Sequence, residues 1–418
     1  MSAGLAVGSA DAPVGRRSLP VAGLVPIVVA LGVLRIPGAD WLYAALGLAL
    51  LVRSRRVPRA STPLAAVYAV CASTSLVATW ADPGAQAFTT SYLWPLLAQG
   101  LFALGVMSGG EPAVQVRRLV GGLVGGLLLA WAVGLAEIAS GIKLIRILSP
   151  TSSMAEMAGN SRWVTTSVFT NYNDFCLGLS MLAVIIFAHL LFVRRVHPLL
   201  ALSRWVVIGS SVALVLVMGS RGALAAGMLS AGVVVLLAVR AVRPRLVAPR
   251  RLALAALALS PVVWWLWSSP YVQDHSTATR EGILDKSFTL WAADPFTAFV
   301  GYGSAGSYAT VTETAYPKIL MDPHNLLLEV ALNFGVLGLA AALWWWLGIV
   351  WGTLAGSLSG RAWDQVGVLS LVAALPLTGV VSSRLLPYVY VTVLATGAHL
   401  MTMTSGGTDR IGRPGPRR

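Results

Sequence analysis

Residues 212–237 read VALVLVMGSRGALAAGMLSAGVVVLL, two apolar runs on either side of Gly219-Ser220-Arg221-Gly222. Each run is apolar on every side, which is typical of helices in lipid. Gly219 and Gly222 allow the tight reversal that two neighbouring helices need. The stretch therefore predicts a helical hairpin in a membrane, with Arg221 at the boundary where the chain reverses.

The composition of the whole chain favours an integral membrane protein. Of the 418 residues, 56% are hydrophobic and only 11% are charged, with a mean hydropathy of +0.76. These apolar segments are too many and too long for a soluble core. In a soluble protein the formal net charge of +14 would suggest nucleic acid. Here most basic residues are topology signals, so we predict no nucleic-acid partner.

The fold class predicted is all-α, a polytopic membrane protein with about twelve transmembrane helices. Residues 19–403 form a single transmembrane domain, and the tails 1–18 and 404–418 are predicted to be disordered. The predicted helices are 20–35, 40–52, 63–80, 90–107, 119–139, 174–193, 205–219, 222–239, 252–268, 325–351, 365–383 and 385–403.

The distribution of basic residues predicts the orientation. Most of the 30 Lys and Arg residues fall in segments that share one side of the membrane, which places both termini in the cytoplasm. Two long outer loops then span 140–173 and 269–324, the second between helices nine and ten. Within the second, Thr279 to Ala292 has the spacing of an amphipathic helix on the outer membrane face, and Gly301-Tyr302-Gly303 marks a turn.

Four basic side chains from separate segments are predicted near the outer surface: Arg162, Arg221, Arg280 and His324. Arg221 opposes the positive-inside bias, which favours a functional role over a simple contact with lipid headgroups. Arg280 begins the amphipathic stretch, where a solvated helix-face arginine is an equal alternative.

His324 is predicted in the first turn of the tenth helix together with Asn325. Asp322 is the expected N-cap, and Pro323 suits the first helical position. The positive end of the helix disfavours a protonated imidazole, so a neutral His324 could act as a general base, and the same terminus attracts phosphate. The alternative is a histidine that merely tolerates the membrane boundary.

Three further polar residues have two interpretations each. Asn171 and Asn173 could contact sugar hydroxyls or cap the sixth helix, for which Asp174 is the preferred cap. Glu329 could be a buried partner of an arginine or a substrate contact.

Several motifs are missing from the sequence. GxxxxGK[ST] does not occur, so no ATP-driven pump is implied. Neither HExxH nor a Cys/His cluster occurs, and Cys71 and Cys176 lack metal-ligand spacing and are expected to be buried. We therefore expect no metal and no cofactor; three arginines could neutralise a diphosphate without a metal.

The chain resembles the O-antigen ligase/polymerase superfamily of polytopic membrane glycosyltransferases over about residues 140–350. The resemblance is carried by Phe169-Thr170-Asn171-Tyr172-Asn173, Ser220-Arg221-Gly222-Ala223-Leu224, Arg280…Trp291…Pro295…Gly301-Tyr302-Gly303 and Pro323-His324-Asn325…Leu328-Glu329…Gly335…Gly338. It implies a glycosyltransferase-C-like fold and an enzyme that transfers a glycan from an undecaprenyl-diphosphate donor to an acceptor hydroxyl at the outer face of the bacterial cytoplasmic membrane, without a metal.

Within that resemblance, Arg221 and Arg280 would hold the diphosphate, His324 would activate the acceptor, and Arg162 is a further diphosphate contact. The partners implied are the lipid-linked oligosaccharide donor, membrane lipids and an acceptor that is a glycan, a lipid or a protein. The alternative function is a flippase or transporter of lipid-linked sugars, which should show internal repeats and charges at mid-membrane. A structural membrane scaffold would leave the outward arginines unexplained.

Overall fold

The computed structural model describes residues 20–54, 61–81, 86–148, 150–151, 153–169, 171–193, 197–242, 275–303, 325–355, 363–378 and 389–405, and every regular element in these ranges is a helix. The elements are η1 (Pro20–Leu24), α1 (Val25–Val33), α2 (Ala39–Ser54), α3 (Thr62–Ala81), α4 (Gln86–Ser108), α5 (Pro112–Ser140), α6 (Leu144–Leu148), α7 (Ser153–Asn160), α8 (Tyr172–Phe192), α9 (Pro198–Val217), α10 (Arg221–Val242), α12 (His275–Ala292), α13 (Pro295–Val300), α15 (Leu326–Ala355), α16 (Trp363–Ala373), α17 (Leu375–Thr378) and α18 (Val389–Ser405).

The all-α, multi-pass membrane class is confirmed. Six helices, namely α3, α5, α8, α9, α10 and α15, are long and apolar enough to cross a membrane. Helices also lie at the other predicted segments, except 252–268, which is outside the described residues. The count of about twelve spans therefore stays a prediction, as do the two tails and the outer loop around α12 and α13.

Local signals fix the ends of the long helix α5. Pro112 occupies its first turn, where a missing N–H costs nothing. Gly141 ends the helix in the left-handed region, with φ of 76°, and donates its N–H to the carbonyl of Glu137. The chain thereby leaves α5 sharply into the segment that carries Arg162.

Glycines bring several helix pairs into backbone contact. Gly47 of α2 lies against the backbone of α4 at Leu101, and Gly105 of α4 lies against Gly47 in return. Gly134 of α5 lies against the ring of Phe175 in α8. Small residues at such crossings are typical of membrane helices, whose association depends on close packing.

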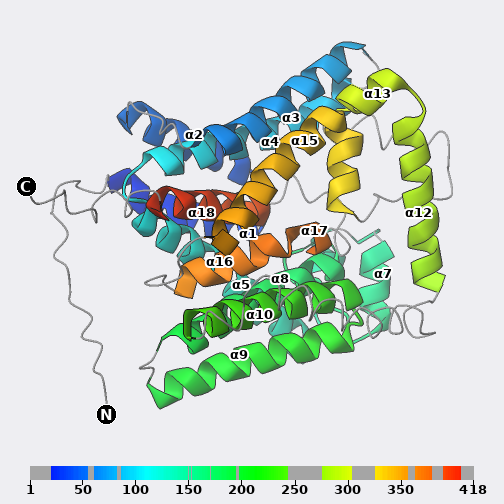
Figure 1. The fold of residues 1–418 in the computed structure, drawn as a ribbon. Coiled ribbons are helices and arrows are strands. Elements are labelled where there is room, and N and C mark those ends of the chain that lie inside the picture. Colours follow the sequence, from blue (N-terminus) through cyan, green and yellow to red (C-terminus); the bar gives the residue numbers. More distant parts are fainter. Residues whose placement is uncertain are drawn as a thin grey trace, which may run out of the picture.

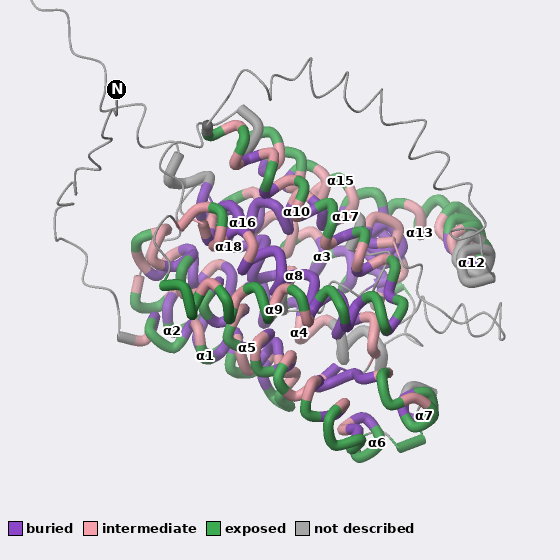
Figure 2. Tube along the Cα trace, turned by 90° about the horizontal axis from the view of Figure 1, so that it is seen from below, coloured by how far each residue is buried: buried purple, intermediate pink, exposed green. Residues whose placement is uncertain are grey.

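Helix α8 forms the centre of the bundle and packs against α5, α9, α10 and α16. Figure 2 shows the buried positions concentrated in the middle of the molecule and exposed positions along α9 and around α6 and α7. Cys71 and Cys176 are both buried and unpaired, as the sequence predicts.

Helix α12 runs across the ends of the other helices rather than along them (Figure 1). Its presence confirms the helix predicted at 279–292. Ile283 is buried at 3% exposure, whereas Phe288 is 55% exposed. We call the end of the bundle that holds α12 and the starts of α8 and α10 the predicted outer end; its side of the membrane follows from the sequence alone.

Candidate functional site

The turn before α10 is tied to the start of α8. Gly219 has a φ of 70°, which permits the reversal predicted from the sequence. The buried hydroxyl of Ser220 donates a 2.9 Å hydrogen bond to Oδ1 of Asn173. Arg221 then opens α10 as an exposed residue. Two predicted site residues, Arg221 and Asn173, therefore lie at one place.

The start of α8 is a dense polar cluster. Asn171 is the N-cap, because its Oδ1 accepts the backbone N–H of Asn173 at 2.8 Å. Asp174, expected from the sequence to be the cap, is instead buried and pairs with Arg35 at 3.3 Å. The guanidinium of Arg35 also lies 5.5 Å from the ring centre of Phe169.

An apolar groove descends from Arg221 between α8, α9 and α10. We call it the α9–α10 groove. It is lined from Leu224 and Val215 near the predicted outer end to Trp205 and Ala231, and its empty volume is about 860 Å³. Met228 on its rim is 61% exposed, so the groove faces the surroundings of the bundle. Leu224 is one helical turn from Arg221.

Arg162 caps the end of α5 in this structure. Its Nε donates to the carbonyl of Ile138 at 3.0 Å and its second amino group donates to the carbonyl of Ala139 at 3.1 Å. Cations are favourable at a helix C-terminus, where carbonyls lack helical partners. The side chain of Lys143 in turn donates to the carbonyl of Arg162 at 2.7 Å.

A buried carboxylate organises the same segment. Glu137 accepts from the backbone N–H groups of Leu144 and Ser167, at 2.6 and 3.0 Å, and from the hydroxyl of Thr165. Burial lowers the pKa of Lys143 from its usual value, while the negative charge of Glu137 opposes that change. These contacts hold the chain between α5 and α8 in place.

The start of α15 differs from the prediction. Oδ1 of Asn325 accepts the N–H groups of Leu327 and Leu328, both at 3.1 Å, so Asn325 is the N-cap and the helix begins at Leu326. The prediction that Asp322 is the cap and that Asn325 lies in the first turn is wrong, whereas the prediction for His324 lies outside the described residues. An asparagine caps as well as an aspartate, and here the later residue of the two does so.

The α15 helix is broken at Gly335, whose φ of 64° and ψ of −168° are non-helical. The turn Gly301-Tyr302-Gly303 docks at this break. The N–H of Tyr302 donates to Leu332 at 2.7 Å, and the N–H of Gly303 donates to Asn333 at 2.9 Å. These carbonyls lose their helical partners at the break, so the turn replaces the missing hydrogen bonds.

Glu329 lies in the half of α15 before that break. Its side chain is buried at 4% exposure, and its carbonyl accepts the side-chain N–H of Asn333 at 2.8 Å. A buried carboxylate one turn inside the helix suits either interpretation made from the sequence, a partner or a substrate contact.

Two predicted site residues are only partly located or lie outside the described chain. Arg280 belongs to α12, but its side chain is outside the described residues, as is the whole of His324. Trp291 and Tyr302 connect the end of α12 to α13. Nε1 of Trp291 donates a hydrogen bond to the carbonyl of Ala298, and the hydroxyl of Tyr302 donates one to the carbonyl of Leu290.

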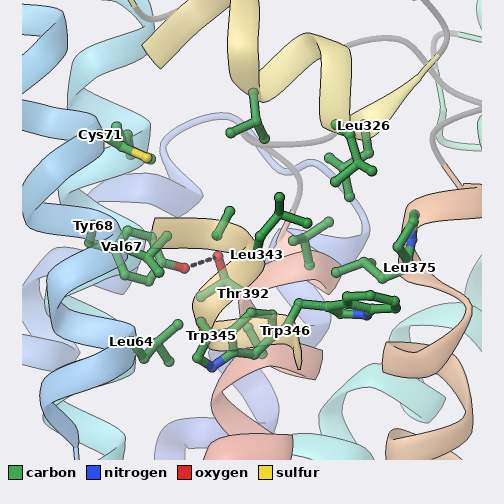
Figure 3. A pocket seen from close by; sticks show the side chains of 17 residues that line it. Leu64, Val67, Tyr68, Cys71, Leu326, Leu343, Trp345, Trp346, Leu375 and Thr392 are labelled. Atoms are coloured by element: carbon green, nitrogen blue, oxygen red, sulfur yellow. Dashed lines mark hydrogen bonds between the residues drawn. The ribbon is translucent and has the colours of Figure 1, made fainter. Parts of the chain in front are cut away.

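A second apolar pocket lies below the start of α15, between α3, α15, α17 and α18 (Figure 3). A hydrogen-bond chain crosses it. Thr392 donates to Oε1 of Gln99 at 2.6 Å, so the hydroxyl of Tyr68, at 2.8 Å, donates to Thr392. The remaining lining is mostly aliphatic and aromatic, as expected of a space for an apolar group.

The helices and the apolar grooves define a multi-pass membrane protein with polar residues gathered at one end. The family model described as O-antigen ligase matches residues 205–343, from α9 to the second half of α15. This match confirms the resemblance to the O-antigen ligase superfamily and supports glycosyl transfer in general. Among curated proteins, none matches the chain significantly.

The matched segment includes three predicted site residues, Arg221, Arg280 and His324. Asn171 and Asn173 precede it and are joined to it through Ser220. The sequence analysis assigned no role to Arg35. Its cue in the sequence is a basic residue on the predicted outer side, against the positive-inside bias.

Proposed function

We propose that this protein transfers a glycan from an undecaprenyl-diphosphate donor to an acceptor hydroxyl at the outer face of the bacterial cytoplasmic membrane, without a metal. The family match supports the reaction class. The observation that supports the donor assignment is that Arg221 lies one helical turn before Leu224, which lines the α9–α10 groove near the predicted outer end.

Arg221 suits a diphosphate for two reasons. A guanidinium binds phosphate oxygens in a bidentate manner and stays charged at all physiological pH values. It also stands at the N-terminus of α10, where backbone N–H groups and the helix dipole favour negative charge. Clamping the diphosphate stabilises the charge that develops as the sugar–phosphate bond breaks, so the lipid diphosphate becomes a good leaving group.

The α9–α10 groove suits the isoprenoid chain of such a donor. The groove starts one turn below Arg221 and continues along α10 to Ala231, and its rim is exposed. A chain lying there would remove apolar surface from its surroundings while the headgroup reaches the arginine. The anchor also limits the motion of the donor, which lowers the entropy cost of the reaction.

In this proposal His324 is the general base that accepts the proton of the acceptor hydroxyl, and Arg280 is the second diphosphate contact. The sugar hydroxyls would be oriented by four polar residues, Asn171, Asn173, Asn325 and Glu329. Arg162 would be a further and weaker contact of the diphosphate from the segment between α5 and α8. A general base contributes about 10²–10⁴-fold to the reaction rate with little effect on donor affinity. An arginine that binds the diphosphate contributes to both the reaction rate and the donor affinity.

The test is glycan transfer from a purified undecaprenyl-diphosphate-linked donor in detergent with EDTA present. His324→Ala should lose transfer but keep donor binding, Arg221→Ala should lose both, and Arg221→Lys should recover only part. Arg146→Ala is the matched control, since Arg146 is an exposed arginine in α6 near the same end. Near-normal turnover by His324→Ala would remove the base assignment, and loss of wild-type activity on EDTA would overturn the metal-free mechanism.

Transport of lipid-linked sugars is the second candidate, and the break in α15 at Gly335 favours it, because discontinuous helices line many transport sites. The discriminating experiment places the protein in vesicles with labelled donor and no acceptor. Movement of the donor between leaflets without transfer would favour the transporter. Transfer that requires acceptor and leaves the donor in its leaflet favours the enzyme.

A further inference from the structure

A cavity far from Arg221 carries two basic groups that the proposed reaction does not use. It lies between α5, α8, α9 and α16 and includes His189, Arg204 and Trp363. His189 is four turns along α8 from the polar cluster at Asp174, and Arg204 is in the second turn of α9. We propose that this cavity binds the phosphate of an anionic phospholipid, independently of glycan transfer.

The first argument is that polar atoms are buried here without partners. Nη1 of Arg204 is buried and has no hydrogen-bond partner. Nδ1 of His189 is buried and has none beyond the backbone carbonyl of its own residue. Buried donors are satisfied in the great majority of proteins, and leaving a charged one unsatisfied is costly. A ligand that accepts hydrogen bonds would satisfy both atoms at once.

The second argument is the charge balance. Arg204 and His189 interact electrostatically across the same space, and no acidic residue is among the described residues that line it. The carboxylate next to Trp363 belongs to Asp364, whose Oδ1 accepts the N–H of Gln365 and whose charge interacts with Arg117. The permanent charge of Arg204, without a local carboxylate, calls for an anion, and the imidazole of His189 adds a hydrogen-bonding group beside it.

The third argument concerns the kind of anion. The rest of the lining is apolar, including Leu128 of α5 and Val207 of α9, and the empty volume is about 600 Å³. Trp205, next to Arg204, is 53% exposed and lines the α9–α10 groove. Tryptophan and arginine at this position are typical of the level of lipid headgroups. A phosphate at Arg204 with an acyl chain along the apolar wall satisfies both parts of the cavity.

The tilted contact between the rings of Trp363 and His189, with 49° between their planes, shows how the site is built. Their ring centres are 4.5 Å apart, so the start of α16 covers one side of the imidazole. The ring nitrogens stay at the edge, where one of them can donate to a phosphate oxygen. The cavity is therefore bordered by three helices and an aromatic ring.

The experiment measures lipid binding to the purified full-length protein by native mass spectrometry, with no glycan donor present. Phosphatidylglycerol and phosphatidylcholine with identical chains are compared. We expect preferential binding of phosphatidylglycerol, roughly tenfold or more weakened in Arg204→Gln and partly kept in Arg204→Lys. The matched control is Arg53→Gln, which removes an exposed arginine from the last turn of α2 and should change nothing.

A second variant covers the case in which Arg204→Gln does not fold. Val207→Trp fills the cavity while keeping both basic groups, and it should also lose phosphatidylglycerol. Equal binding of the two lipids, or equal loss in Arg53→Gln, would overturn the proposal. Displacement of the lipid by millimolar inorganic phosphate would assign the site to a soluble anion instead. Transfer activity is not read out, so failure of the proposed function would leave this result unaffected.

Discussion

The hydroxyl of Ser220 donates to Oδ1 of Asn173 at 2.9 Å, and this bond joins the starts of α10 and α8. It places Arg221 beside the capped end of α8 and above the α9–α10 groove. The buried hydroxyl of Ser220, together with the bond from Ser180 to the carbonyl of Ala223, therefore holds the arginine beside the asparagines.

A double-mutant cycle tests this joint. Ser220→Ala and Asn173→Ala should each lower stability by about 0.5–1.5 kcal/mol, because each removes a part-buried hydrogen bond. The double variant should cost less than the sum, with a coupling of roughly 0.5–3 kcal/mol in thermal unfolding. Ser230→Ala is the control, since Ser230 bonds only within α10, to Ala226. Additivity of Ser220→Ala with Asn173→Ala would show that the bond is not made.

Replacing Asn325 separates capping from substrate binding. Asn325→Ala should lower stability by about 0.5–2 kcal/mol through loss of the N-cap. Asn325→Ser keeps a cap oxygen but loses the amide N–H donors, so it should restore stability and not transfer. Recovery of both properties in Asn325→Ser, measured by melting temperature and turnover, would remove Asn325 from the substrate site.

Gly335 should resist substitution. Gly335→Ala places a Cβ against the backbone of Phe299 at a positive φ, so we expect a loss of roughly 1–3 kcal/mol or more and release of α13 from α15. Gly348→Ala in the same helix meets nothing within 4 Å and should be neutral or slightly stabilising. Hydrogen exchange at Tyr302 and Gly303 reads the docking directly, and unchanged protection there would contradict the prediction.

Arg162 should matter for stability more than for donor affinity. Arg162→Met removes two hydrogen bonds to the end of α5 and should cost on the order of 1 kcal/mol. Arg146→Met changes an exposed arginine of α6 and should leave both stability and donor binding unchanged. If Arg162→Met instead weakens donor binding as much as Arg221→Ala, then Arg162 contacts the diphosphate.

Cysteine labelling tests the orientation. A cysteine at Gly282, an exposed position in α12 with no neighbour within 4 Å, should label from outside the cell, and one at Arg413 from inside. The native Cys71 and Cys176 are buried and should contribute little background. Labelling of both sites from one side would mean that the number of spans between them is even rather than odd.

The features that could be predicted from the sequence have local causes. The reversal at Gly219, the helix over 279–292 and the turn at Gly301-Tyr302-Gly303 all occur where the sequence places them. Each depends on residues within a few positions, such as a glycine that permits a positive φ. The family match over 205–343 falls on the same stretch.

The features that were missed depend on contacts between distant segments. Arg162 faces the carbonyls of α5, and Arg35 meets Asp174, which is 139 positions away. The break at Gly335 is stable because the turn after α13 supplies its hydrogen bonds. The predicted N-cap of α15 was wrong for another reason. Aspartate and asparagine are both good N-caps, so propensity alone does not choose between Asp322 and Asn325.

The docking of the Gly301-Tyr302-Gly303 turn means that the chain leaves and re-enters the bundle at almost the same point. Gly303 bonds to Asn333, and Asn325 begins the same short half of α15, about two turns away. Doubling the length of a loop with fixed ends costs only roughly 0.6 kcal/mol of chain entropy. The segment between Gly303 and His324 can therefore change in length without moving a helix, so in the proposed transferase acceptor recognition can diverge there while His324 and the membrane bundle are kept.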